Sequence, residues 1–365
     1  MSWFYRHVVR PVLFTQESES AHNRTLAALA LASRSRSVGR CVAAFARVPN
    51  LPVQTMGLRF PNPVGLAAGM DKRAVALPMW RALGFGFSEL GGVTWHAQPG
   101  NPAPRMFRVI QEEALINRMG FNNSGAAAMV VQLQDWRRRG DWPDHPVGIN
   151  LGKSKVTPLA EAATDYGLSL EALWPLGDFF VVNVSSPNTP NLRQLQDRTA
   201  LDDILAALQE RNCRAGIPKP LLVKVAPDLS FEALDEIVEV ALRRNLAGIV
   251  ATNTTITRPK SNNPRTMKLY EETGGLSGRP LRERSTEVVR HLYRQSQGKL
   301  VLVGVGGVAS AADAWEKVTA GASLVQIYSG LVFQGPFLVR EIVRGLRERL
   351  AGAPWEDAVG SEARQ

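Results

Sequence analysis

The stretch NVSSPNTPNL at residues 183–192 sets three Asn, two Ser and a Thr directly behind the apolar run 179–182. Neutral amides and hydroxyls both donate and accept hydrogen bonds, so they can read a planar heterocycle without burying a charge. Any one of these residues could equally serve as a turn or capping residue. Their number in one short loop favours a binding site.

Other apolar runs also end in polar or glycine residues. Amides, hydroxyls or a lysine follow at Asn150, Lys224 and residues 252–254, and glycine-rich ends follow at 304–307 and 328–330. Backbone N–H groups in glycine-rich ends, together with the start of a following helix, form a common phosphate site. Since no G-x-G-x-x-G opens a βαβ unit, FMN is favoured over a dinucleotide.

The elements that would hold these ends alternate between strand and helix. Eight short apolar runs are predicted as strands: 64–69, 87–93, 147–152, 179–186, 221–227, 248–253, 300–307 and 323–330. Helical patterns lie between them, as at 200–213, 231–245, 281–295 and 310–320. This alternation predicts an α/β fold, a (β/α)₈ TIM barrel, with its active site at the carboxyl ends of the strands. The long stretches 94–146 and 254–280 are expected to serve that site.

Residues 1–40 form a different region, which we assign as an N-terminal arm before a barrel domain at 41–350 and a polar tail at 351–365. The arm contains six Arg and two acidic residues, Glu17 and Glu19, so its net charge is +6 − 2 = +4 of the total +10. We expect two short helices, the first limited by Pro11 and the second capped by Ser18 or Ser20. The arm either docks on the barrel as a cap or anchors the protein on a membrane surface, since no run is long enough to cross one.

Composition bears on three other classes of protein: those with disulfide frameworks, those that bind metals and those that bind nucleic acids. Two cysteines, Cys41 and Cys213, make a disulfide framework unexpected, and neither lies in a pattern typical of a metal site. The basic balance leaves nucleic-acid binding open on charge alone. We expect no metal and no nucleic-acid partner.

Several long motifs occur in an order that resembles the dihydroorotate dehydrogenase family. They are GLAAGMDK (65–72), INRMGFNNSG (116–125), NVSSPNTP (183–190), KVAPDLS (224–230), ATNTT (251–255), TGGLSGRPL (273–281), GVGGV (304–308) and ASLVQIYSG (322–330). The basic arm and Ser186 resemble the membrane-associated, quinone-dependent class 2. The resemblance implies oxidation of dihydroorotate to orotate in pyrimidine biosynthesis, with FMN as hydride acceptor and a membrane quinone as electron acceptor.

The resemblance also implies a catalytic loop. Ser186 matches the base that removes a proton from dihydroorotate, Thr189 a relay for that proton, and Phe121 a residue that closes the pocket. Thr189 could equally satisfy only the turn. The matching substrate contacts are Lys72, Asn117, Arg118, Met119, Gly120, Phe121, Asn183, Asn188, Asn253 and Thr254.

FMN contacts follow from the same motifs. They fall on Ala68, Gly69, Met70, Asp71, Lys72, Gly92, Asn150, Asn183, Lys224, Thr252, Gly278, Gly307, Tyr328 and Ser329. Gly92 departs from the family, which often places Thr there, so a hydroxyl contact is either missing or supplied by Thr94. The quinone-site matches are His22, Arg108 and Tyr328.

Three alternatives remain at this point. A class 1 enzyme that uses fumarate or NAD, and a flavin-dependent tRNA dihydrouridine synthase, would each use a Cys as base. A barrel that serves only as a membrane or nucleic-acid adaptor has charge as its sole support. We expect the cytoplasmic face of a bacterial inner membrane, in preference to a mitochondrial membrane. The sequence leaves the choice between monomer and homodimer open.

Overall fold

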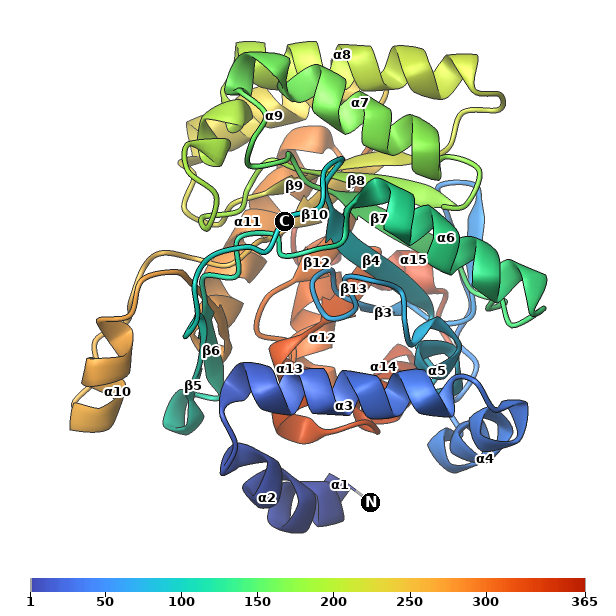
Figure 1. The fold of residues 1–365 in the computed structure, drawn as a ribbon, viewed down its shortest axis with the longest axis vertical. Helices are drawn as coiled ribbons and strands as arrows, with labels where there is room; N and C mark the ends of the chain where they lie inside the picture. Colours follow the sequence, from blue (N-terminus) through green and yellow to red (C-terminus); the bar gives the residue numbers. More distant parts are fainter. Residues whose placement is uncertain (1, 365) are drawn as a thin grey trace.

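In the computed structural model, which describes residues 2–364, eight parallel strands close into a barrel (Figure 1). Around the barrel the strand order is β10-β12-β13-β3-β4-β7-β8-β9. The strands are β3 (Val64–Leu66), β4 (Phe87–Val93), β7 (Val147–Leu151), β8 (Phe179–Asn183), β9 (Leu221–Val225), β10 (Gly248–Ala251), β12 (Val301–Val305) and β13 (Leu324–Ile327). Each lies inside one of the eight predicted runs, so the predicted (β/α)₈ barrel is confirmed.

Helices cover the outside of the barrel. They are α5 (Leu77–Ala82), α6 (Gly125–Arg138), α7 (Ala162–Leu173), α8 (Arg198–Arg214), α9 (Phe231–Arg243), α11 (Arg282–Ser296), α12 (Ala311–Thr319), α13 (Ser329–Gln334) and α14 (Leu338–Leu350). The four predicted helical stretches correspond to α8, α9, α11 and α12. Because these helices bury the outer face of the strands, the strands read as unbroken apolar runs.

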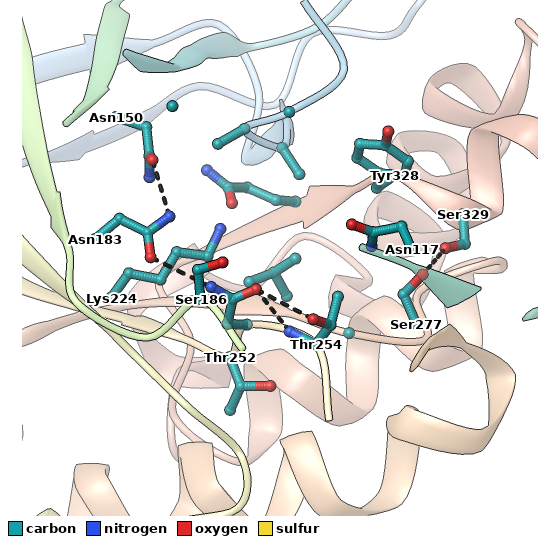
Figure 2. A pocket seen from close by; sticks show the side chains of 18 of the residues that line it. Asn117, Asn150, Asn183, Ser186, Lys224, Thr252, Thr254, Ser277, Tyr328 and Ser329 are labelled. Carbon is teal, nitrogen blue, oxygen red and sulfur yellow. Dashed lines mark hydrogen bonds between the residues drawn. The ribbon is translucent and has the colours of Figure 1, made fainter. Parts of the chain in front are cut away.

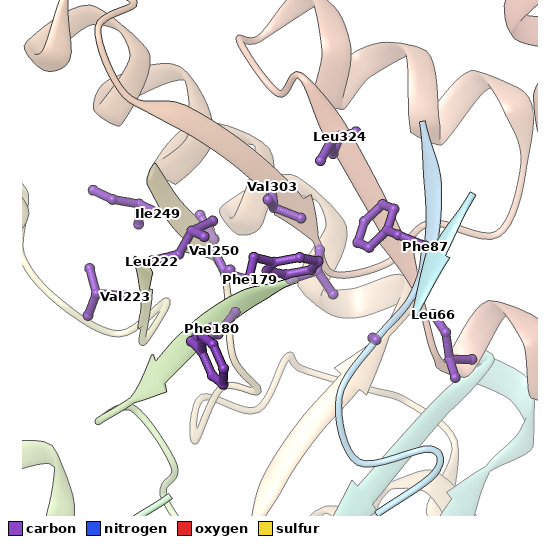
Figure 3. Packing of buried hydrophobic residues seen from close by; sticks show 14 of the residues in the cluster. Leu66, Phe87, Phe179, Phe180, Leu222, Val223, Ile249, Val250, Val303 and Leu324 are labelled. Carbon is purple, nitrogen blue, oxygen red and sulfur yellow. The ribbon is translucent and has the colours of Figure 1, made fainter. Parts of the chain in front are cut away.

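Aromatic rings fill the end of the barrel where the strands begin (Figure 3). Phe87 and Phe179 are the first residues of β4 and β8, and their ring centroids lie 6.2 Å apart. A Cβ on Gly65 would lie 2.2 Å from the Phe87 ring, and one on Gly148 would lie 2.1 Å from the Phe179 ring. Glycine at these two strand positions therefore makes room for the rings. The hairpin β1 (Val53–Thr55) and β2 (Leu58–Phe60) adds Phe60 against Phe87.

The two predicted insertions meet in one small sheet. Strands β5 (Met106–Val109) and β6 (Ala114–Asn117) come from the first insertion, and β11 (Gly275–Gly278) comes from the second, which also holds α10 (Pro264–Tyr270). They pair antiparallel in the order β11-β6-β5 over a small core of Val109, Ala114, Ile116 and Leu276. The insertions are thus ordered and joined to each other, as expected of segments that serve a site.

The N-terminal arm holds more helix than predicted. It comprises α1 (Ser2–Phe4), a π-helical turn Tyr5–Val9, α2 (Arg10–Phe14), α3 (Ser18–Ala32) and α4 (Arg36–Ala46). Pro11 does not end the first helix, because it occupies the first turn of α2, where an N–H needs no helical partner. Helix α4 crosses the boundary placed at residues 40 and 41.

The cap of the second helix, α3, differs from both serines that were predicted. The Glu17 side chain accepts hydrogen bonds from the backbone N–H groups of Glu19 at 2.9 Å and Ser20 at 2.7 Å. A carboxylate satisfies two free N–H groups at once and also interacts favourably with the helix dipole. The prediction of Ser18 or Ser20 as the cap is therefore wrong.

The C-terminal segment is not simply a polar tail. It contains α15 (Trp355–Ala358), and the side chain of Trp355 is buried, with its Nε1–H donating to the Ser323 carbonyl at 3.1 Å. The Ala363 carbonyl accepts from Arg294 Nε at 2.9 Å. The segment packs against the barrel. None of the helices within residues 2–364 combines the length and hydropathy that a membrane crossing requires.

Candidate active site

A polar cavity opens at the carboxyl ends of the barrel strands, and Asn117 of β6 and Ser277 of β11 also line it (Figure 2). Most of the predicted catalytic, substrate and cofactor residues line it: Ala68, Gly69, Lys72, Gly92, Asn117, Met119, Gly120, Phe121, Asn150, Asn183, Ser186, Asn188, Lys224, Thr252, Asn253, Thr254, Gly278, Gly307, Tyr328 and Ser329. Residues that lie far apart in the sequence are therefore brought together as the motifs indicated.

The loop after β8 carries Ser186, which is 7% exposed. Its Oγ accepts from the Asn188 backbone N–H at 3.3 Å, and the Asn188 amide donates to Asn117 Oδ1 at 3.1 Å. On the other side of β8, the Tyr166 hydroxyl donates to the Asn183 carbonyl at 2.9 Å. The loop is thus tied to both β6 and α7, and the Ser186 hydroxyl is held at the cavity wall.

Thr189 does not line the cavity, although its hydroxyl is buried beside the loop. Its Oγ1 has no hydrogen-bond partner, and neither does Asn188 Oδ1. Buried polar atoms normally find a partner, so both sites call for a water molecule or a ligand group. An unsatisfied Thr189 hydroxyl fits a relay better than a residue that only holds the turn.

Side-chain amides form a connected chain along the cavity floor. The Asn150 Nδ2 group donates to Glu89 Oε1 at 2.6 Å, and the Asn183 Nδ2 group donates to Asn150 Oδ1 at 3.0 Å. Asn183 Oδ1 in turn accepts from Asn253 Nδ2 at 3.2 Å. Four strands, β4, β7, β8 and β10, or the residues just after them, supply these groups, which fixes their relative positions.

Lys72 supplies a positive charge at the wall of the polar cavity, where it is half-buried. Its Nζ donates to Asn122 Oδ1, and desolvation, assisted by the nearby Arg105 charge and opposed by Glu19, lowers the pKa of Lys72 to about 8. Because Glu19 forms its ion pair with Arg105, the Lys72 ammonium group can receive an anionic ligand group.

Three other predicted contacts point away from the polar cavity. Asp71 is fully buried and accepts from the Val75 and Ala76 N–H groups and from Trp80 Nε1, so it holds the loop after β3 together. Burial raises the pKa of Asp71. Arg118 pairs with Glu272 at 2.6 Å and stacks on Phe107, whereas Met70 faces the apolar cavity described below. The side chains of these three residues therefore do not line the polar cavity, and their contacts with a ligand stay predictions.

Gly92 is explained by its neighbours. A Cβ there would lie 2.7 Å from the Phe121 ring and 3.1 Å from Asn150 Oδ1. The Thr94 hydroxyl donates to the His96 carbonyl at 2.5 Å and accepts from Asn123 at 2.8 Å, and Thr94 does not line the polar cavity. That Thr94 supplies a hydroxyl contact in place of position 92 stays a prediction, which these contacts do not favour. Glycine at 92 instead allows Phe121 to approach.

The far end of the polar cavity is rich in glycine. Gly278, Gly306 and Gly307 adopt φ values of 97°, 130° and 72°, which only glycine adopts without strain. The hydroxyls of Ser277 and Ser329 lie 2.8 Å apart across this end. Two buried acceptors at the cavity, Thr252 Oγ1 and Gln326 Oε1, have no partner within the protein. Unsatisfied groups and open backbone N–H groups fit a ligand with both a phosphate and a polar ring.

A second cavity of about 640 Å³ lies between the arm and the barrel, and its walls are mostly apolar. The three predicted quinone-site residues, His22, Arg108 and Tyr328, all line it. Burial lowers the pKa of His22 to about 4, so the ring is neutral at pH 7. Arg108 donates to the carbonyls of Phe14 at 3.0 Å and Gln16 at 2.6 Å, and so fixes the turn between α2 and α3. Tyr328 lines both cavities.

Sequence reasoning missed several lining residues. Ala67, Ser277, Leu281, Val305, Val308 and Gln326 also line the polar cavity, together with Gly306 and Gly330 of the predicted glycine-rich ends. Glu89 and Gln326 interrupt otherwise apolar strands, and such interruptions could have marked them. Neither Cys41 nor Cys213 lines the cavity, and both are exposed, which removes a cysteine base at this site. No cluster of potential metal ligands occurs within residues 2–364.

Comparisons with known proteins agree over nearly the whole chain. The family model described as dihydroorotate dehydrogenase matches residues 50–350. A Gloeobacter violaceus protein named dihydroorotate dehydrogenase (quinone) is 52% identical over 350 residues, which is 96% of either chain. One of the same name from a Synechococcus species is 51% identical over 381 residues and 99% of either chain. A crystal structure of DHODH from Eimeria tenella in complex with ferulenol aligns with a TM-score of 0.83 and 34% identity, over 95% of this chain and 96% of that one.

Proposed function

The chain belongs to the dihydroorotate dehydrogenase family, and we propose that it oxidises dihydroorotate to orotate in pyrimidine biosynthesis, with FMN as cofactor and a membrane quinone as electron acceptor. The observation that carries this proposal is that Tyr328 lines both the polar and the apolar cavity. A substrate site full of amides thus adjoins a space suited to a lipid-soluble molecule.

The polar cavity fits FMN and a pyrimidine side by side. Gly278, Gly306, Gly307 and the Ser277–Ser329 pair would hold the phosphate end, and Lys224 and Thr252 would face the ring. When bound, FMN accepts the hydride from the substrate and passes the electrons on to the acceptor. Asn117, Asn188, Asn253 and Thr254 would bind the pyrimidine, and Lys72 its carboxylate.

Ser186 would take the proton that leaves the substrate as the hydride departs. A serine hydroxyl is a weak base at neutral pH, so it needs a fixed position and an outlet for the proton. The Asn188 N–H fixes its oxygen, and the unpartnered Thr189 hydroxyl lies three residues along the same loop. Phe121 would cover the substrate, with its ring against Gly92 and Gly152.

The arm would hold the protein on a membrane and admit the quinone. Large apolar side chains are exposed along it, including Trp3 at 64%, Val12 at 63% and Leu31 at 72%. Exposed aromatic and aliphatic residues among arginines suit the boundary of an anionic bilayer. We place the protein at the cytoplasmic face of a bacterial inner membrane, in keeping with bacterial relatives.

Two measurements test the proposal together. The purified protein should show a flavin absorption spectrum from noncovalent FMN, and dihydroorotate oxidation should proceed with a quinone and not with fumarate or NAD. A protein that stays colourless after reconstitution with FMN, or one that prefers fumarate or NAD, would contradict it.

A further inference from the structure

Glu89 is a fully buried carboxylate on β4, inside the barrel and behind the polar cavity. One of its oxygens accepts from Asn150 Nδ2 at 2.6 Å and the other from Gln326 Nε2 at 2.5 Å. Its hydrogen-bond partners are thus two neutral amides, from β7 and β13. A buried carboxylate needs strong hydrogen bonds, so these contacts hold all three side chains in place.

The carboxylate also decides which way the amides point. Both oxygens of Glu89 act as acceptors, so Asn150 and Gln326 must turn their NH₂ groups toward it and their carbonyl oxygens away. The Asn150 oxygen then accepts from Asn183 (Figure 2), and the Asn183 oxygen accepts from Asn253 and from the Ser185 backbone N–H. Glu89 therefore orients Asn150 and Gln326 directly, and the Asn183 orientation agrees with it.

Gln326 is the second amide that donates a hydrogen bond to Glu89. Its Oε1 is buried, lines the polar cavity and has no partner within the protein. The geometry therefore leaves an acceptor at the cavity wall that requires a donor from the ligand.

We propose that Glu89 is a positioning residue that sets the hydrogen-bond polarity of the cavity, so that Gln326 presents an acceptor to the ring N–H of the bound flavin. This inference rests on the proposed function for the presence of FMN. The oxidised isoalloxazine ring has a single N–H, at N3, and otherwise presents acceptors. An amide in the reversed orientation would place its own NH₂ against that group.

The two ends of an amide have nearly the same shape, so packing alone hardly selects between them. In Glu89→Gln, the new amide satisfies Asn150 or Gln326 but not both in their present orientations. Loss of one buried hydrogen bond corresponds to about a tenfold to hundredfold change in affinity. We therefore expect FMN affinity to fall in this variant, although the side-chain volume is unchanged.

The test uses the full chain, with FMN affinity from fluorescence titration and the ¹⁵N resonance of N3 from labelled FMN. Glu89→Gln and Gln326→Leu should each weaken FMN binding about tenfold or more and move the N3 resonance toward that of a flavin without a hydrogen bond. The exchanged double variant Glu89→Gln/Gln326→Glu restores an acceptor at 326 and should recover the N3 resonance. Asp165→Asn changes another buried carboxylate, which contacts Ser154 and Thr157 and not the cavity, and should leave N3 unchanged.

Each outcome separates this inference from the proposed function. An N3 resonance that is unchanged in Gln326→Leu, or a Glu89→Gln variant with wild-type affinity, would overturn the inference while leaving FMN binding intact. Equal effects in Asp165→Asn would also overturn it, because they would indicate a general loss of stability. A wild-type protein that binds no FMN would overturn the proposed function, and this inference with it.

Discussion

The polar cavity is walled by strand ends of the barrel, whereas the apolar cavity is walled by helices of the arm on one side and by the barrel on the other. In the first, amides from three strand ends hydrogen-bond in series to the buried Glu89, and Lys72 adds a charge at the wall. In the second, His22 is the main polar side chain beside Arg108 and Tyr328, and burial favours the neutral form of its ring. From this difference we propose that proton chemistry belongs to the barrel and passage of a lipid-soluble acceptor to the arm.

The attachments of the two regions differ as well. The barrel cavity is held by strand pairing, whereas the arm is joined to the barrel by side-chain packing, as at Leu26, and by side-chain hydrogen bonds and ion pairs. Tyr5 donates to the Val332 carbonyl at 2.7 Å, Arg10 to the Phe333 carbonyl at 3.0 Å, and Arg105 pairs with Glu19 at 2.7 Å. We therefore expect the two regions to be separable by mutation, and the predictions below test that separation.

The largest effect should follow from Ser186→Ala. Loss of a general base typically costs about 10²–10⁴-fold in rate, so reduction of the bound flavin by dihydroorotate should slow by that factor. Binding of FMN and reoxidation by quinone should be unaffected, since neither requires the hydroxyl. Stopped-flow absorbance checks both steps, and a wild-type rate of reduction would show that Ser186 is not the base. Ser185→Ala is not a suitable control because Ser185 contacts Asn183.

A bulky side chain in the apolar cavity should slow reoxidation of the flavin and leave its reduction unchanged, which is the opposite of the effect of Ser186→Ala. Ala21 is 9% exposed on the face of α3 that lines this cavity. Extra atoms in a packed space cost about 1–3 kcal/mol, so Ala21→Phe should slow reoxidation by a long-tailed quinone about tenfold or more. Reduction by dihydroorotate should not change. Ala27→Phe, on the exposed face of the same helix opposite the residues that line the cavity, is the matched control, and an equal effect there would argue against a quinone passage.

The pH dependence of orotate binding should report Lys72. Because the pKa of Lys72 is lowered to about 8, the protonated form that attracts a carboxylate is complete below that pH and is lost above it. A bound carboxylate raises this pKa, so affinity should fall about tenfold per pH unit between the free and bound values. Lys72→Met should bind weakly with a flat profile over the same range. A wild-type profile that stays flat between pH 7 and 10 would show that Lys72 does not pair with the ligand.

The smallest effect is expected at the junction of arm and barrel. Arg105 and Glu19 are only 14% and 15% exposed, so their pairing is less screened than a surface pair. Glu19→Gln should lower the free energy of unfolding by about 1 kcal/mol and slow quinone turnover modestly. The exposed pair Arg344–Glu348 provides the control, because Glu348→Gln should change stability by only a few tenths of a kcal/mol, at most about 0.5. Chemical denaturation measures both.

Sequence reasoning located the barrel and most of the polar cavity because both depend on local patterns. Apolar runs such as 221–225 are buried on both faces, and polar residues at strand ends converge once the strands are parallel. The sequence did not predict the directions in which loop side chains point. Asp71 and Met70 adjoin Lys72 in one motif, yet the loop after β3 turns each toward a different neighbour.

The arm was harder to predict, for a physical reason. In α4, Val42 and Ala46 pack inward, but the larger Val38 and Phe45 are exposed. A helix with large apolar side chains on both its packed and its exposed sides does not follow the usual pattern of burial. The buried interior residues Glu89 and Gln326 were missed for a different reason, since each lies within a strand that reads as mostly apolar.

The separation of the two regions is tested most directly by removing residues 1–34, which leaves Ser35 to cap α4. Stopped-flow measurements should then follow reduction by dihydroorotate, reoxidation by a long-tailed quinone and reoxidation by a small water-soluble acceptor. We predict that reduction and the small acceptor remain as fast as in the full chain, while the long-tailed quinone reacts much more slowly. If the shortened protein is reoxidised by the long-tailed quinone at the rate of the full chain, the arm does not guide the acceptor and the account is contradicted.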